Sequence, residues 1–113
     1  MAPDDVIRIQ HMKDAAESAL RFVENKRRAD LDANLMLVFA LTRAVEIIGE
    51  AASKVSPEGR AELPKVPWTK IVGMRNRLVH AYFDVDLETL WNTVELALPE
   101  LLNQLGPPGG YQE

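Results

Sequence analysis

The 113-residue chain contains no cysteine, which excludes a disulfide-stapled scaffold, a Cys-ligated zinc or iron-sulfur site, and thiol catalysis. It is also poor in aromatic residues, at 6%, so aliphatic side chains must fill the core. There is no excess of positive charge, because 13 Lys and Arg stand against 17 Asp and Glu, for a net charge of -4. Proteins that coat nucleic acid through bulk electrostatics have a strongly basic footprint. The charge balance therefore argues against that class and leaves only a local basic site open.

Long apolar runs are also missing. No run approaches the roughly 20 residues of a membrane span, and the segment from Met1 to Asp5 carries acidic residues where a signal peptide has positive ones. We therefore expect a cytoplasmic protein that contacts no membrane.

The length is close to the modal size of one domain. We expect a single domain over residues 1–105 and a flexible tail over residues 106–113, which begins Gly-Pro-Pro-Gly-Gly.

Strand alternation, internal repeats and Gly-rich phosphate loops are absent, whereas apolar residues recur at the three- and four-residue spacing of amphipathic helices. This spacing predicts four main helices, over residues 4–25, from Asp30 as N-cap to about Val55, from Trp68 to about Val79, and after Asp86 as N-cap. The stretch between Ser56 and Pro67 has room only for a turn or a short helix. We therefore predict an all-α, up-and-down bundle of four main helices plus a short extra helix.

Two residues inside these helices predict local features. Gly49 costs up to about 1 kcal/mol relative to Ala in a helix interior, which indicates that another helix crosses closely at that point. Pro99 interrupts the last helix, so we expect a kink or a restart near Ala97 and Leu98.

One segment, residues 74–83 with the sequence MRNRLVHAYF, concentrates chemically capable side chains within an apolar helix. On a regular helix of about 100° per residue, Asn76 and His80 lie on nearly the same face. His80 and Tyr82, in contrast, point in opposite directions. Convergence of both residues with Arg75 and Asn76 therefore requires the helix to end near His80.

This set of side chains suits phosphodiester cleavage. Histidine transfers protons near neutral pH, and arginine can hold a phosphate through two hydrogen bonds while charge develops on its oxygens. Asn76 could orient the imidazole, and Tyr82 could donate to phosphate or stack on a base. RNA supplies its own nucleophile, the 2′-hydroxyl, so such a site requires neither a metal nor a protein nucleophile.

A purely structural interpretation stays open at this point. Arg75 could pair with a carboxylate such as Glu46 or Glu50, while His80 and Tyr82 only finish a helix. The basic cluster at residues 26–28 could likewise stabilise a helix C-terminus or touch phosphate, and the first interpretation is the more common one.

The segment RNRLVHAY, residues 75–82, resembles the R-x4-H-x-Y signature of HEPN-domain proteins. Three flanking segments resemble the HepT subgroup of that family: EIIGEAA at residues 46–52, VPWTKIVGM at residues 66–74, and the stretch from Asp86 through Trp91 to Leu101. The resemblance covers nearly the whole chain.

The resemblance implies a HEPN-type homodimer whose paired motifs form one composite cleft and supply local positive charge. It implies a metal-independent endoribonuclease without a cofactor, acting on tRNA or mRNA as the toxin of a type VII-like toxin-antitoxin system. Carried over to this chain, Arg75 and His80 are the catalytic pair and Asn76 supports them. Glu46 and Arg77 are candidates for auxiliary roles.

The resemblance also implies a partner, an MntA-like minimal nucleotidyltransferase that acts as the antitoxin. Such a partner uses ATP and Mg²⁺ to attach AMP to the motif tyrosine, and Tyr82 occupies that position here. A different hypothesis is that the chain is a non-catalytic helical binding module that docks the nucleotidyltransferase.

Overall fold

The computed structural model describes residues 1–81 and 84–106, without the side chains of residues 79–81 and 84. Its helices are α1 (Pro3–Phe22), α2 (Asp30–Ala33), α3 (Leu35–Ser53), α4 (Pro57–Ala61), α5 (Trp68–Val72), α6 (Met74–Leu78), α7 (Leu87–Asn92), the π-helical turn η1 (Thr93–Ala97) and α8 (Leu98–Leu105). Two short strands, β1 (Val79–Ala81) and β2 (Asp84–Val85), pair antiparallel with an irregular register.

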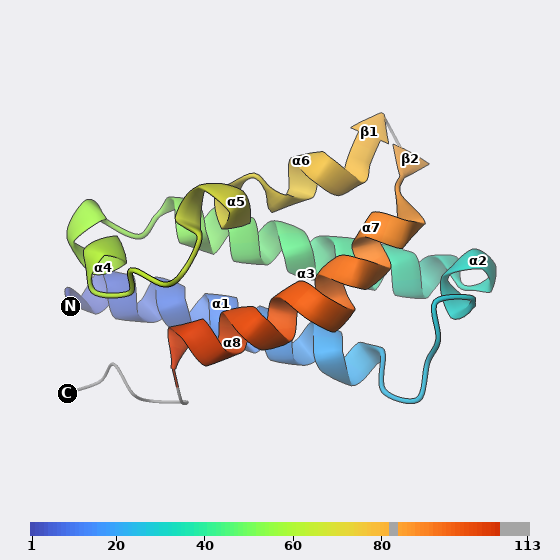
Figure 1. Ribbon diagram of the computed structural model, residues 1–113, viewed down its shortest axis with the longest axis horizontal. Coiled ribbons are helices and arrows are strands. Elements are labelled where there is room, and N and C mark those ends of the chain that lie inside the picture. The colour runs from blue at the N-terminus through green and yellow to red at the C-terminus, as the bar shows by residue number, and fades with distance from the viewer. Residues whose placement is uncertain (82–83, 107–113) are drawn as a thin grey trace.

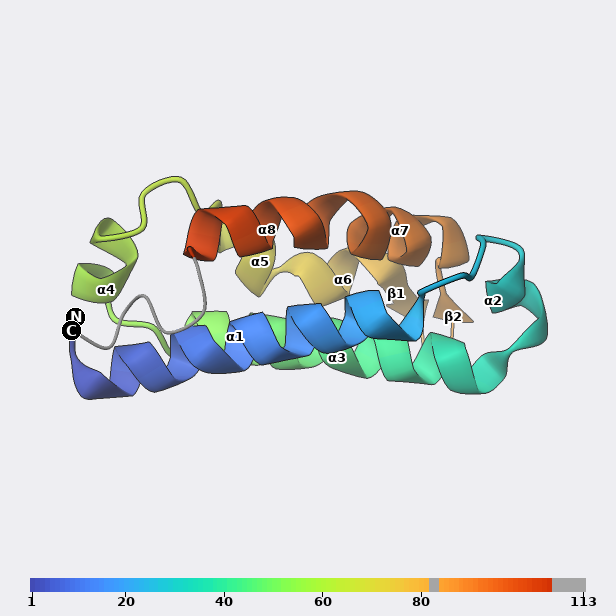
Figure 2. The ribbon, with the colours of Figure 1, turned by 90° about the horizontal axis from the view of Figure 1, so that it is seen from below.

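These elements form an up-and-down bundle of four rods, α1, α3, α5–α6 and α7–η1–α8 (Figure 1). α1 packs between α3 on one side and η1 and α8 on the other, while α3 also packs against α5 and α6 (Figure 2). The fully buried core is aliphatic, with side chains such as Ile9, Leu41, Ile48 and Leu98 at its centre. The predicted all-α bundle is confirmed. The short β1–β2 pair is an addition that was not predicted, because the sequence there shows no sustained alternation of apolar and polar residues.

The prediction of one helix from Asp30 to about Val55 is wrong at its start. The chain leaves helical geometry at Asn34, with φ -134° and ψ 87°, so that α2 and α3 are separate. The Asn34 side chain accepts a hydrogen bond from Leu37 N at 3.0 Å and thereby caps α3. Asp30 is not an N-cap; its carboxylate accepts from Arg27 N at 2.6 Å.

The third predicted helix is also divided. Gly73 separates α5 from α6, and the helical segment ends at Leu78, because Val79 already belongs to β1. Glycine loses more backbone entropy than any other residue when it becomes helical. A helix is therefore interrupted at a glycine with little loss of stability. Pro67 is the N-cap of α5, which begins at Trp68 as predicted.

The last rod agrees with its prediction. Asp86 caps α7, since its side chain accepts from Thr89 N at 3.0 Å. The predicted restart is the π-helical turn η1, after which α8 begins with Pro99 in its first turn. Proline is tolerated there because the N–H that it lacks has no partner in a first turn.

The predicted close crossing at Gly49 is confirmed. A Cβ atom on Gly49 would lie 3.3 Å from the carbonyl oxygen of Val72 and 3.4 Å from that of Ile71. The α5 backbone therefore lies directly on α3, and this contact sets how far α6 can lie from α3.

The start of α1 is tied to α4 by a buried carboxylate. Asp5, only 4% exposed, accepts hydrogen bonds from Ser56 N at 2.9 Å and Ser56 Oγ at 2.5 Å. Ser56 Oγ in turn accepts from Gly59 N at 3.0 Å and caps α4. The two hydrogen bonds from Ser56 lower the pKa of Asp5, against a smaller opposing effect of burial. Elsewhere on α1, burial lowers the pKa of Lys13, and the charge of Glu17 partly opposes this.

Two features are absent from the described residues. None of the helices there is both long and apolar enough to cross a membrane. The same part of the chain holds no group of three or more His, Asp or Glu side chains placed to share a metal ion.

Candidate functional site

Arg75 of α6 faces Glu46 of α3 across the bundle surface. Arg75 Nε donates to Glu46 Oε2 at 2.6 Å, and the two side chains are 49% and 28% exposed. Glu46 Oε1 lies 3.9 Å from Arg43 Nη1. Among the described residues Glu46 is the only hydrogen-bond partner of Arg75, and it takes Nε. Neither terminal nitrogen of the guanidinium has a hydrogen-bond partner within the described part of the chain.

These residues line a cavity of about 410 Å³ between α3 and the α5–α6 rod. Its lining comprises Glu46, Gly49, Glu50 and Ser53 from α3, Val72 from α5, and Arg75 and Asn76 from α6. We call this cavity the Arg75 groove. Arg75 and Asn76, predicted to act together, do share one groove.

The choice between Glu46 and Glu50 as the partner of Arg75 is settled in favour of Glu46. Glu50 also lines the Arg75 groove, but within the described part of the chain it makes no ion pair. The structural interpretation of Arg75 and the functional one are compatible, because pairing through Nε orients the guanidinium without occupying its terminal nitrogens.

The predicted helix end near His80 is confirmed. α6 ends at Leu78, and the backbone of His80 continues in β1. Asp86 N closes the turn that follows by donating to Leu78 O at 2.6 Å. The side chain of His80, and Tyr82 altogether, lie outside the described residues.

Arg77 does not join Arg75. It lies in a second cavity, of about 320 Å³, where the α5–α6 rod meets η1 and α8. Lys65 and Lys70 line the same cavity, although neither was predicted as a site residue. A signal for Lys70 was present, since residues seven apart, such as Lys70 and Arg77, share a helix face.

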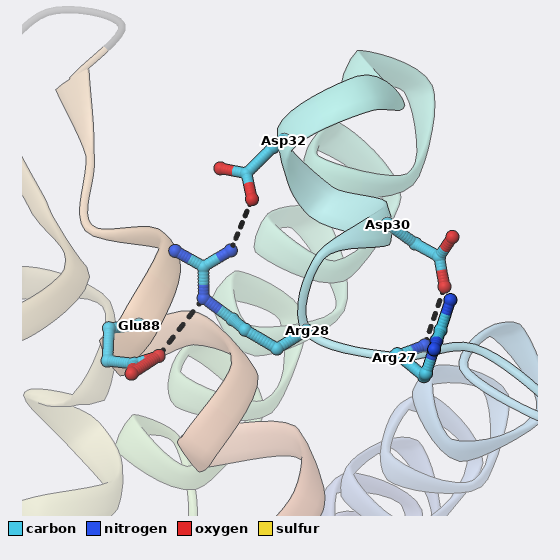
Figure 3. Close-up of polar contacts among 5 residues, drawn as sticks. All are labelled: Arg27, Arg28, Asp30, Asp32 and Glu88. Carbon is cyan, nitrogen blue, oxygen red and sulfur yellow. Dashed lines mark hydrogen bonds and ion pairs between the residues drawn. The ribbon is translucent and has the colours of Figure 1, made fainter.

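The basic cluster at residues 26–28 has a structural role through Arg28 (Figure 3). Arg28 Nη1 lies 3.1 Å from Asp32 Oδ2, and Arg28 Nε lies 3.0 Å from Glu88 Oε2. These contacts connect the segment after α1 both to α2 and to the first turn of α7. Arg28 is therefore engaged within the fold.

The all-α bundle and the family match over most of the chain place the protein in the HEPN class. Residues 12–106 match the family described as ribonuclease HepT-like, and the chain belongs to this family. The resemblance found in the sequence is thus confirmed, and with it the assignment to ribonucleases, enzymes that cleave RNA.

Related proteins agree with this assignment. The chain is 37% identical over 95 residues to the "Probable ribonuclease HepT" of Thermococcus cleftensis, covering 80% of this chain and 86% of that protein. It is 37% identical over 95 residues to "Putative RNase MJ1380" of Methanocaldococcus jannaschii, covering 81% and 87%. It is 35% identical over 97 residues to "Putative RNase TTE0752" of Caldanaerobacter subterraneus subsp. tengcongensis, covering 86% and 87%. No solved structure gives a significant match.

Proposed function

We propose that this chain is the toxin of a two-gene toxin-antitoxin system, an endoribonuclease that cleaves tRNA or mRNA without a metal ion. The proposal rests on the way Arg75 is held at the groove. Glu46 holds it through Nε at 2.6 Å, and its terminal nitrogens are left beside an open groove. A guanidinium presented in this way suits a phosphate oxygen pair.

In the proposed reaction, the 2′-hydroxyl oxygen of the RNA bonds to the adjacent phosphorus, and the bond to the 5′-oxygen of the next nucleotide breaks. Arg75 stabilises the negative charge that develops on the phosphate oxygens. His80 accepts the proton of the 2′-hydroxyl or supplies the proton to the leaving 5′-oxygen. Asn76, on the same groove, supports the site from the helix side.

We propose that the active form is a homodimer joined through the outer face of α3. This face exposes Leu35, Met36 and Phe39, and beside it lies a mainly apolar cavity of about 510 Å³ between α1 and α3. Exposed apolar patches of this kind mark interaction surfaces. Arg43 and Glu46 continue the same helix toward the Arg75 groove, so pairing across α3 would bring two such grooves near each other.

We also propose that an MntA-like nucleotidyltransferase neutralises the toxin by transferring AMP from ATP to the Tyr82 hydroxyl, with pyrophosphate as the leaving group. The added phosphate would place bulk and negative charge within the motif and repel the RNA backbone. Tyr82→Phe should escape neutralisation by an active transferase. AMP labelling and inhibition that persist in Tyr82→Phe would exclude this site.

The nuclease proposal is tested by incubating purified protein with RNA in the presence of a chelator. Wild type should cleave, His80→Ala and Arg75→Ala should not, and all three should still bind the transferase. Equal cleavage by wild type and His80→Ala would contradict the assignment. Transferase binding with no cleavage by the wild type would favour the binding-module hypothesis instead.

The dimer is tested by light scattering on Phe39→Glu, which introduces a charge at a side chain that is 51% exposed on α3. The matched control is Leu96→Glu on η1, which is 69% exposed and belongs to a different rod of the bundle. Phe39→Glu should be monomeric and Leu96→Glu dimeric. A dimeric Phe39→Glu would move the interface away from α3.

A further inference from the structure

The second cavity, on the other side of α6 from the Arg75 groove, concentrates positive charge. Its volume is about 320 Å³, and its walls carry Lys65 from the turn before α5, Lys70 from α5 and Arg77 from α6. Among the described residues, Glu100 of α8 is the one carboxylate in its lining. We call this cavity the basic groove.

The three cations of the basic groove are exposed, and within the described part of the chain none of them makes an ion pair or hydrogen bond. Other arginines are engaged. Arg28 pairs with two carboxylates, and Arg60 donates to the backbone oxygens of Val55 and Ala52. The cations of the basic groove therefore contribute no ion pair to the fold described here.

The floor of the basic groove is closed. Ile71, Met74 and Leu101 line it, but each is at most 5% exposed, so they belong to the core of the bundle. Pro67 and Ala97 add some apolar lining, but no aromatic residue among the described ones lines the groove to anchor a protein partner. The groove offers an occupant exposed positive charges at its rim, which is the chemistry of backbone phosphate contacts.

The basic groove and the Arg75 groove are adjacent. Arg75 and Arg77 are two positions apart on α6, which is roughly 3 Å along the helix axis and about 200° around it. Between them stands Asn76, and all three side chains are exposed. A single RNA strand that crosses the outer surface of α6 therefore meets both grooves within a few nucleotides.

We propose that Lys65, Lys70 and Arg77 bind backbone phosphates of the RNA next to the cleaved bond, an inference that rests on the proposed ribonuclease function. They act as binding residues that hold the strand in place across α6, and they read no base. This assigns Arg77 a role different from that of Arg75, although the two stand in the same motif.

The test uses His80→Ala as a non-cleaving background and measures the affinity for single-stranded RNA at several salt concentrations. The variant is the triple substitution Lys65→Gln, Lys70→Gln and Arg77→Gln. For single strands each lost phosphate contact lowers the salt slope by about 0.7, so three contacts lower it by about 2. Between 50 and 200 mM salt, the background protein should therefore lose about 20-fold more affinity than the triple variant.

The matched control removes three exposed cations outside the basic groove, with Lys26→Gln, Arg27→Gln and Lys54→Gln. Both triple variants change net charge equally, so bulk electrostatics predicts the same effect for each. In the cleaving protein, the basic-groove variant should raise KM and leave kcat much less affected, while its thermal melting matches that of wild type.

An unchanged salt slope in the basic-groove variant, or an equal change in the control, would overturn the proposal. Retained RNA affinity combined with lost transferase binding would also overturn it and assign the groove to the partner. The salt slope is measured in the His80→Ala background and does not depend on cleavage. A failure of the nuclease proposal would instead appear in the cleavage assay, as a wild type that cleaves no RNA.

Discussion

Replacing Glu46 with alanine should separate catalysis from stability. The pair between Glu46 and Arg75 is partly exposed, with side-chain exposures of 28% and 49%. Exposed ion pairs contribute about 0–1 kcal/mol to folding, so the free energy of unfolding of Glu46→Ala should fall by no more than about 1 kcal/mol. The variant should still fold, but the Arg75 guanidinium should lose its fixed orientation.

The effect on cleavage should be much larger. Without the hydrogen bond to Nε, the long Arg75 side chain is free to take other rotamers, and a displacement of about 1 Å at a reacting group can cost about 100-fold in rate. We expect kcat to fall by about 10- to 100-fold. KM should not rise, because the substitution removes a negative charge from beside the bound phosphate.

The assay is steady-state cleavage of RNA with three variants. Glu46→Gln keeps an oxygen that can accept from Arg75 Nε, so it should retain more of kcat than Glu46→Ala. Glu50→Ala is the matched control, since Glu50 lies one turn further on α3 and lines the same groove without an ion pair among the described residues. An unchanged kcat in Glu46→Ala, or an equal loss in Glu50→Ala, would refute the positioning role of Glu46.

Three further predictions concern stability. The hydrogen bonds from Ser56 lower the pKa of Asp5 in the folded protein. The ionised carboxylate should therefore stabilise the fold at pH values above the ordinary carboxyl pKa near 4. This stabilisation should disappear as the pH falls through the lower pKa of the folded state. Asp5→Asn should therefore lose about 1–3 kcal/mol in urea unfolding at pH 7 and much less near pH 2; a constant difference would contradict the linkage. Gly49→Val should lower the free energy of unfolding by about 1–3 kcal/mol, because its Cβ would press on Val72 O, and an unchanged urea midpoint would speak against that crowding. A double-mutant cycle between Arg28 and Glu88 should give a coupling of about 0.2–1 kcal/mol that fades in 1 M salt, and a salt-independent coupling would exclude a screened ion pair.

The order of the rods followed from apolar periodicity, and Pro99 predicted the interruption of the last rod, but the interruptions at Asn34 and Gly73 were not predicted. Gly49 and Gly73 are the same residue type in similar apolar surroundings, yet α3 continues through Gly49 whereas the chain breaks between α5 and α6 at Gly73. The difference lies in tertiary contact, because α5 packs onto the backbone at Gly49. A residue's local propensity does not contain that information.

The partner of Arg75 was equally ambiguous from the sequence. Glu46 and Glu50 lie on one face of a helix, so the choice depends on how far α6 is shifted along α3. That shift is set by the crossing at Gly49, which is a property of the packed bundle. The motif itself was visible in the sequence because its residues are close together in the chain.

The basic groove, unlike the motif, was not visible in the sequence. Lys65, Lys70 and Arg77 come from a turn and two short helices, so no single periodic pattern links them. Only the pair Lys70 and Arg77 could have been found by helical spacing. Sites assembled from several segments become visible only after the chain has folded.

The glycine at position 49 also limits how this protein can change during evolution. Gly49 both supports α5 and lines the Arg75 groove. Even an alanine there would require the α5 backbone to shift by a few tenths of an ångström, and a larger residue would require a larger shift. New substrate preferences are therefore accessible mainly through Glu50 and Ser53, which line the groove with exposed side chains. A library for redirected specificity should vary those two positions and keep the glycine.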